Sequence, residues 1–285
     1  MMVSIVVTAY NVEQFIAQAI ESCLAQSFKD IECIVVEDCS TDATAHIIEQ
    51  IGKRDKRVRI IRNCKNMGAG ASRREGIEAA VGEYILLLDG DDWLEENFVE
   101  TLYGKAKESN ADIVSGGIKI VHNNGAWEAS SYGNCVTEGK EKVTRFWGEK
   151  VVFMNNKLIH RRLHEKVPYC ERRFIEDTPT IIPQLYFANK VVYVDNIGYN
   201  YRMQENSLTH KASPFKYALF RALCAEELIT FFEKHDKEYI KTIPLGIGYG
   251  EQIKKIREIN PTKEMIAPYK EEWIEFTTAM IRRLR

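Results

Sequence analysis

Two hydrophobic periods alternate along the first half of the chain. Residues 3–8 form an apolar, β-branched run without polar alternation, and from residue 12 to 24 apolar side chains recur at the spacing of an amphipathic helix. The same pair of patterns repeats and predicts strands at 31–36, 58–62, 84–88 and from 112, with helices around 47–51, 71–81 and 98–106. Strands of this kind, separated by helices, are typical of a mostly parallel sheet covered on both faces. The fold class is therefore α/β.

The pattern of hydrophobic positions changes after residue 167, and all seven prolines of the chain lie beyond this point. The regular alternation of strand and helix stops there. From Pro214 onward, apolar residues again follow helical spacing, as in Phe215, Leu219 and Leu223. We expect a less regular middle segment followed by a helical C-terminal region.

The composition is that of an ordinary globular protein without an excess of either charge. The 285 residues include 39 Lys and Arg against 41 Asp and Glu, which argues against nucleic acid as a partner. Seven scattered cysteines without a CxxC pair indicate reduced thiols. The longest uncharged stretches have 12 residues, fewer than the ~20 that span a bilayer, and the strand-like start does not resemble a signal peptide. We therefore expect a cytoplasmic protein.

Chemically distinctive side chains follow three of the predicted strands directly. In parallel sheets, ligands bind beyond the carboxyl ends of the strands. Tyr10 follows the first strand and can stack on a nucleobase, and Asp38 follows the second and can accept a hydrogen bond from a base or a ribose hydroxyl. Asp91 and Asp92 follow the strand at 84–88 and can hold a divalent cation through oxygen. The set predicts a site for a nucleoside diphosphate and its metal ion.

Each of these residues also has a simpler interpretation. Asp38 alone is typical of a helix N-cap, and Tyr10 of an aromatic residue packed on its own helix. The acidic run that begins at Asp89 is compatible with a solvated turn at a helix start. Three carboxylates within four residues repel one another, however, and a bound cation relieves that repulsion. The cluster as a whole therefore favours a binding site.

Three segments together resemble family 2 glycosyltransferases of the GT-A fold, namely residues 3–11, 34–42 and 82–92. The similarity extends over roughly residues 3–210. Glu176-Asp177 resembles the acceptor-side Glu-Asp pair of the polysaccharide-building members, and Tyr199 to Arg202 resembles their closing Tyr-Arg motif. The sequence departs from the family pattern at Glu37, Cys39 and Arg74, where Asp, Gly and Asn are more usual.

The resemblance implies a GT-A domain over residues 1–213, with a nucleotide-binding half of about 1–117 and an acceptor-side half of about 118–213. Residues 214–285 would form the helical C-terminal extension. It further implies an inverting hexosyltransferase of cell-surface polysaccharide synthesis. The donor would be a UDP-hexose or UDP-N-acetylhexosamine, and the acceptor a saccharide or lipid-linked oligosaccharide. The enzyme would act in the cytoplasm, with peripheral contact at the inner face of the membrane as a further expectation.

Roles for individual residues follow from the same resemblance. Asp177 is expected to be the catalytic base, and Asp92 the ligand of Mn or Mg. Nucleotide binding is expected from Thr8, Tyr10, Asp38, Arg73 and Asp91. Glu176 is the second choice as base, and Arg202 and His210 are further candidates for contacts with the diphosphate.

Two other functions fit the residues and stay open at this point. Asp89-Gly90-Asp91 at a strand end also suits a phosphohydrolase, which would release phosphate without a sugar acceptor. A non-catalytic nucleotide-sugar-binding protein would bind UDP without turnover. A nicotinamide dehydrogenase is disfavoured, because the turn after the first strand contains no glycine.

Overall fold

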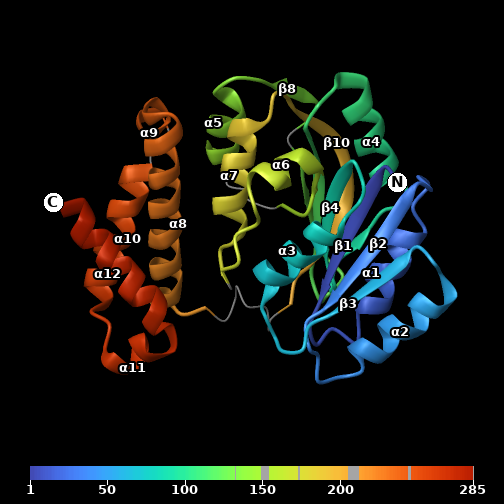
Figure 1. Cartoon of the computed structure of the whole chain (residues 1–285), viewed down its shortest axis with the longest axis horizontal. Coiled ribbons are helices and arrows are strands. Elements are labelled where there is room, and N and C mark those ends of the chain that lie inside the picture. Colours follow the sequence, from blue (N-terminus) through green and yellow to red (C-terminus); the bar gives the residue numbers. More distant parts are fainter. Residues whose placement is uncertain (132, 149–153, 173, 205–211, 243–244, 285) are drawn as a thin grey trace.

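A single large β-sheet with helices on both faces forms the centre of the protein (Figure 1). The computed structural model describes residues 1–131, 133–148, 154–172, 174–204, 212–242 and 245–284. Along the main path of the sheet the strand order is β3-β2-β1-β4-β9-β6-β10-β5. This confirms the predicted α/β class.

The first half of the chain forms four parallel strands that alternate with helices. The strands are β1 (Val3–Ala9), β2 (Ile31–Glu37), β3 (Val58–Arg62) and β4 (Tyr84–Asp89). The helices are α1 (Ile16–Leu24), α2 (Thr44–Arg54), α3 (Ala69–Ala79) and α4 (Phe98–Ser109). All lie where the hydrophobic pattern predicts them, except that α1 begins four residues later than expected.

Both faces of these strands are buried, which explains why they lack polar alternation. In β1, Val3, Ile5 and Val7 belong to one apolar core, whereas Val6 belongs to the other. All four side chains are 0% exposed. The sheet therefore separates two apolar cores. Polar side chains that bind a ligand are expected at the edges of the sheet and not on its faces.

The chain after β4 extends the sheet with strands of both directions. The strands are β5 (Trp93–Leu94), β6 (Ile113–Val121), β7 (Trp127–Ser130), β8 (Cys135–Thr137), β9 (Lys157–His160) and β10 (Val191–Arg202). β9 is antiparallel to both β4 and β6, and β10 is parallel to β6. The interleaved helices are α5 (Glu141–Gly148), α6 (Arg161–Lys166) and α7 (Asp177–Phe187). The carboxyl ends of β4, β6 and β10 consequently share one edge of the sheet.

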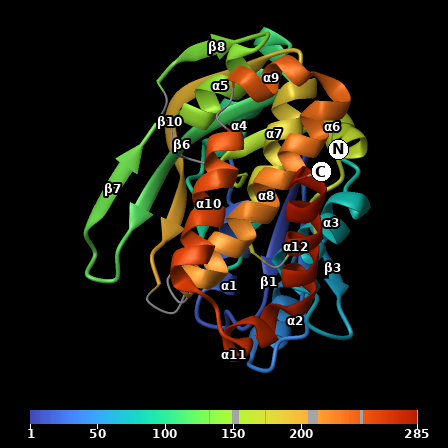
Figure 2. The same cartoon turned by 90° about the vertical axis from the view of Figure 1, so that its left-hand side faces the viewer.

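The C-terminal region is helical, as predicted, and packs on α7 (orange to red in Figures 1 and 2). Its elements are α8 (Pro214–His235), α9 (Lys237–Thr242), α10 (Leu245–Ile259), α11 (Lys263–Ile266), the 3₁₀ helix η1 (Ala267–Tyr269) and α12 (Lys270–Leu284). Phe174 contacts the rings of Tyr217 and Phe220 on α8 edge-on. The helices thus share one apolar core with the sheet. Among the described residues, no helix has the length and apolar character of a membrane span.

Candidate functional site

The loops after β1 and β2 brace each other at the shared edge of the sheet. The Asn11 side-chain oxygen accepts a hydrogen bond from the Thr41 amide at 2.8 Å, and the Val12 amide donates to the Thr44 hydroxyl at 2.9 Å. The first loop occupies the residues before α1, which is why that helix starts late. Tyr10 at its tip is 45% exposed. Its ring is therefore held on a rigid loop and is free to stack on a ligand.

Asp38 ties this region to the loop before α3. Its carboxylate accepts hydrogen bonds from the Asn63 side chain and from the amides of Met67 and Gly68, each at 2.8 Å. The Thr44 amide at the start of α2 donates a hydrogen bond to the Asp42 side chain instead. Asp38 therefore does not cap α2, and its buried carboxylate fixes the backbone of a loop at the site.

The residue after Asp38 shows why glycine is more usual at this position. Cys39 has a φ of 61°, in the left-handed region that glycine adopts most easily. A glycine is therefore the less strained residue at this turn. The neighbouring Glu37 accepts a hydrogen bond from the Ser40 amide at 2.6 Å, so a carboxylate still closes the turn.

Asp89, the first acid of the cluster, is neutralised by protein groups. One carboxylate oxygen accepts a bond from Arg73 Nη2 at 2.7 Å and a longer one from the Thr8 hydroxyl at 3.3 Å. The other accepts from the Asn155 side chain at 2.8 Å. Asp89 thus has a cation and two neutral donors before any ligand binds.

Asp92 points into the sheet and is 1% exposed. Its two oxygens accept hydrogen bonds from the Tyr199 hydroxyl at 2.6 Å and the Arg202 amide at 2.8 Å. Burial raises its pKa well above the ordinary value, and the nearby charges of Asp91 and Asp89 add to the rise. This carboxylate joins the acidic loop to β10, and its predicted role as a metal ligand stays a prediction.

Asp91 has fewer protein partners. Among the described residues, its carboxylate accepts one hydrogen bond, from the Gln204 side chain at 2.7 Å. Burial and the charge of Asp89 raise its pKa to about 6. Of the three acids, Asp91 has the carboxylate with the most unused acceptor capacity and no strong ion pair.

Arg202 braces the same loop. Its Nε donates to the Asp91 carbonyl at 2.9 Å, and its guanidinium lies 4.6 Å from the ring centroids of both Phe15 and Trp93. The predicted contact with a diphosphate is not tested by this arrangement. His210 lies outside the described residues.

The acidic loop fits a metal ion that the substrate helps to coordinate. Within the described ranges, no group of three or more His, Cys, Asp or Glu side chains is arranged to hold a metal ion alone. Mg²⁺ commonly uses one or two carboxylates and completes its shell with substrate phosphates and water. Asp91 can serve as such a carboxylate, because its oxygens are the least committed.

Arg73 connects the acidic loop to the Glu-Asp pair. It is 6% exposed, and its guanidinium forms ion pairs with Asp89, with Glu176 and, at 3.3 Å, with Asp177. Coulombic attraction to these groups raises the pKa of Arg73 well above the ordinary value, against the opposing effect of burial, which is the largest single influence. The sequence predicts a nucleotide contact for Arg73, and the structure places it among three carboxylates.

Glu176 and Asp177 lie at the N-terminus of α7, where Asp177 is the first helical residue. One oxygen of Asp177 accepts hydrogen bonds from the Tyr169 hydroxyl and from Arg73, and the other accepts, among the described residues, only the one from the Met154 amide at 3.4 Å. Burial raises the pKa of Glu176; the Arg73 charge opposes the rise and Asp177 adds to it. The fold thus brings residues 73, 89, 176 and 177 together.

Three neutral residues of this network were not predicted: Asn155, Tyr169 and Tyr199. They contact Asp89, Asp177 and Asp92, respectively. Nothing in their local sequence separates them from core residues, although Tyr199 belongs to the Tyr-Arg motif named above. Their role becomes visible only once the strands are placed.

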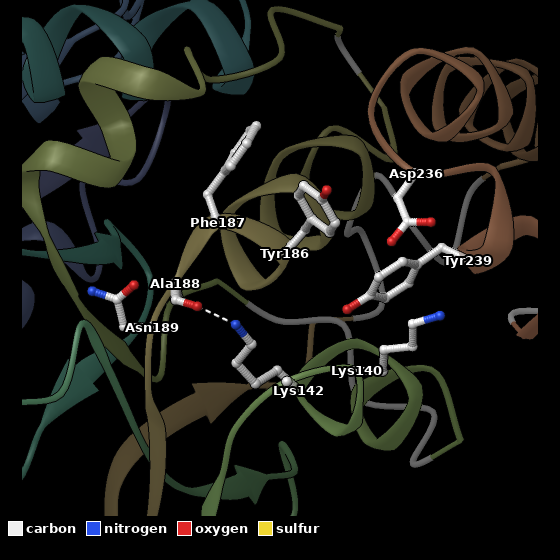
Figure 3. Close-up of a pocket in the computed structure, with 9 residues that line it drawn as sticks. Lys140, Lys142, Tyr186, Phe187, Ala188, Asn189, Asp236 and Tyr239 are labelled. Carbon is white, nitrogen blue, oxygen red and sulfur yellow. Dashed lines mark hydrogen bonds between the residues drawn. The ribbon is translucent and has the colours of Figure 1, made fainter.

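An open pocket of 570 Å³ lies elsewhere, beside the amino end of β10 (Figure 3). The side chains of Lys140, Lys142, Tyr186 and Tyr239 contribute to its lining, and Lys142 donates a hydrogen bond to the Ala188 carbonyl. None of the predicted site residues lines it. The pocket is therefore separate from the network of carboxylates.

Comparison with known proteins agrees with this geometry. The family model described as glycosyl transferase family 2 matches residues 4–168. The glycosyltransferase GlyG of Streptococcus pneumoniae is 27% identical over 274 residues, which cover 92% of this chain and 87% of GlyG. The uncharacterized glycosyltransferase EpsJ of Bacillus subtilis is 34% identical over 231 residues, which cover 76% of this chain and 65% of EpsJ.

A solved structure shares the fold. The crystal structure of S. aureus TarS residues 1–349 in complex with UDP-GlcNAc has a TM-score of 0.72 at 21% sequence identity. The match covers 98% of this chain and 81% of that one. The family model spans more than half of the chain, and it includes the strand-end residues from Thr8 to Asp92. The chain therefore belongs to glycosyl transferase family 2 and is a glycosyltransferase.

Proposed function

We propose that the protein transfers a sugar from a UDP-sugar to a saccharide or lipid-linked acceptor in polysaccharide synthesis, with inversion and with the help of Mn or Mg. The observation that carries this proposal is the Arg73 network. It links Asp89 at the donor side to Glu176 and Asp177 at the acceptor side. The complex of TarS with UDP-GlcNAc supports a UDP-sugar donor. The cytoplasm, at the inner face of a membrane, is the proposed site of action and rests on the family resemblance.

In this proposal the loops after β1 and β2 bind the nucleotide. The exposed ring of Tyr10 stacks on the base, Thr8 contributes to the pocket, and Asp38 holds the loop that closes it and reads the base. Asp38 has acceptor capacity beyond its three protein bonds, because two carboxylate oxygens offer about four acceptor positions.

We assign the metal role to Asp91 rather than to Asp92. Asp92 is buried against Tyr199 and Arg202, whereas Asp91 has acceptor positions that no described residue occupies. When bound, the cation supplies Lewis-acid stabilisation of the charge that develops on the departing diphosphate. The family resemblance also implies that Asp91 reaches the ribose. Asp91 can have both roles if one of its carboxylate oxygens binds the cation and the other contacts the ribose.

The chemical step needs a base on the face opposite the diphosphate. Asp177 accepts the proton of the acceptor hydroxyl as that oxygen forms its bond to the anomeric carbon. The bond between that carbon and the diphosphate breaks, and its electron pair leaves with the diphosphate. Base assistance of this kind contributes ~10² to 10⁴ in rate.

The proposal is tested by a screen of nucleotide sugars with metal and a panel of saccharide acceptors. Thermal stabilisation by one UDP-sugar, followed by UDP release and a glycosylated product, is the expected result. Release of inorganic phosphate without an acceptor would instead indicate the phosphohydrolase. Stabilisation without turnover on any acceptor would indicate a nucleotide-sugar-binding protein.

Asp38→Ala is expected to weaken UDP binding by ~1 to 3 kcal/mol, the scale of hydrogen bonds to a charged group. The change removes both a contact to the base and the anchor of the 67–68 backbone. Calorimetric titration with UDP measures the effect. The control is Asp112→Ala, since buried Asp112 accepts a 2.6 Å bond from the Asn189 amide at the other end of β10. If both variants melt earlier and both keep full UDP affinity, Asp38 has only a structural role.

A further inference from the structure

Tyr169 lies at the meeting point of the site's charges. It is 3% exposed, and its hydroxyl contacts both Arg73, at 3.1 Å, and a carboxylate oxygen of Asp177. Its ring also faces the Arg73 guanidinium, 5.9 Å from the ring centroid. The residue follows the stretch matched by the family model, which ends at residue 168.

The direction of the two hydrogen bonds follows from the chemistry of the groups. A guanidinium can only donate, so the Tyr169 oxygen accepts from Arg73 Nη1. An ionised carboxylate can only accept, so the same hydroxyl donates its proton to Asp177 Oδ1. Burial raises the pKa of Tyr169 well above its ordinary value although the Arg73 charge opposes this, so the phenol keeps its proton.

This arrangement makes the two oxygens of Asp177 unequal. Within the part of the chain that the structure describes, Oδ1 accepts hydrogen bonds from Tyr169 and Arg73, whereas Oδ2 accepts only the one from the Met154 amide at 3.4 Å. A hydrogen bond of that length is weak. The oxygen with the free lone pair is therefore Oδ2.

We propose that Tyr169 is a positioning residue that holds Asp177 Oδ1, so that Oδ2 takes the proton of the acceptor hydroxyl. The inference rests on the proposed function and assigns the reacting atom of its base. In many catalytic sites a further group orients the side chain that acts as the base. Here the orienting group is a neutral phenol backed by a buried cation.

Among the described residues, the charged and titratable groups around Asp177 come from four parts of the chain. Arg73 faces it from α3, Tyr169 from the segment before α7, and Glu176 from the N-cap of α7. Lys157 on β9 is 1% exposed and interacts electrostatically with Asp177. Replacement of Tyr169 by Phe removes its hydrogen bond to Asp177 and changes neither the charge of the site nor the aromatic ring.

Tyr169→Phe tests the inference, with Tyr84→Phe as the matched control. Both tyrosines are 3% exposed, and the Tyr84 hydroxyl donates to the Ala111 carbonyl at 3.0 Å, away from the base. With the donor and acceptor found in the screen, Tyr169→Phe is expected to lower kcat by ~10- to 100-fold, because a hydrogen bond to a charged group is lost. KM for both substrates and UDP affinity are expected to stay near those of the wild type.

The pH profile separates positioning from a structural effect. Loss of a donor to the ionised carboxylate favours its protonated form, so the acidic limb of kcat should move to higher pH in Tyr169→Phe. Tyr84→Phe should lower the melting temperature to a similar extent and leave kcat and the pH profile unchanged. Equal kcat and equal profiles in the two variants would overturn the inference. An inactive wild type would overturn the proposed function, and the inference with it.

Discussion

Asp177→Asn is expected to lower sugar transfer by at least ~10²-fold and to leave UDP affinity nearly unchanged. The amide keeps the shape of the side chain and one acceptor oxygen for Tyr169, but it cannot take a proton from the acceptor. UDP contacts the other side of the Arg73 network in the proposed mechanism. Transfer rates measured at saturating donor, together with calorimetry of UDP binding, separate the two effects.

Glu176→Gln is the matched control for this variant. Glu176 lies beside Asp177, pairs with the same guanidinium, and has a pKa that burial raises. Its replacement removes one of the negative charges that pair with buried Arg73, so we expect a lower melting temperature and a smaller loss of transfer. Near-normal transfer by Asp177→Asn together with none by Glu176→Gln would move the base by one residue. Tyr169 would then have no base to position.

The sequence predicts the strands and helices of residues 3–109 well for a physical reason. Strands buried on both faces must be apolar throughout, and helices that cover them must be amphipathic, so both periods are visible in the order of residues. β9 has four residues and β5 has two, which is too short for a period to appear. Their antiparallel insertion between or beside longer strands depends on tertiary pairing alone.

The candidate site also has residues that the sequence predicts and residues that it does not. Residues directly after a predicted strand could be assigned to one edge, because parallel strands end together. The partners that orient them come from distant positions: Arg73 and Tyr169 are 96 residues apart, and Asp92 and Tyr199 are 107 apart. Such contacts leave no local pattern. The family resemblance supplies Glu176 and Asp177, but only the three-dimensional structure shows which oxygen of each acid already accepts a hydrogen bond.

The difference between Asp91 and Asp92 leads to the second large effect. The pKa of Asp91 is raised to about 6, first by burial and then by Asp89, above its ordinary value of 3.8. The ionised form is therefore disfavoured in the folded protein. Without a cation, this unfavourable contribution is absent below about pH 4, grows as the pH rises, and is complete above about pH 6. It corresponds to at most about 3 kcal/mol of the free energy of unfolding.

Asp91→Asn is accordingly expected to have two opposite consequences. In EDTA the variant should melt at a higher temperature than the wild type at pH 7.5 and at the same temperature near pH 4, because the amide carries no charge to bury. With Mn or Mg and UDP, the wild type should gain stability and the variant should gain little, since the carboxylate that binds the cation is missing.

Asp92→Asn should keep the stabilisation by metal and UDP, because its amide can still accept a bond from Tyr199 or Arg202. Melting curves in these conditions, with calorimetry of UDP binding in the presence and absence of EDTA, decide between the two acids. If Asp92→Asn loses the metal-dependent part of UDP binding and Asp91→Asn retains it, then Asp92 is the metal ligand, as the family resemblance implies, and its side chain must turn away from Tyr199 when the donor binds.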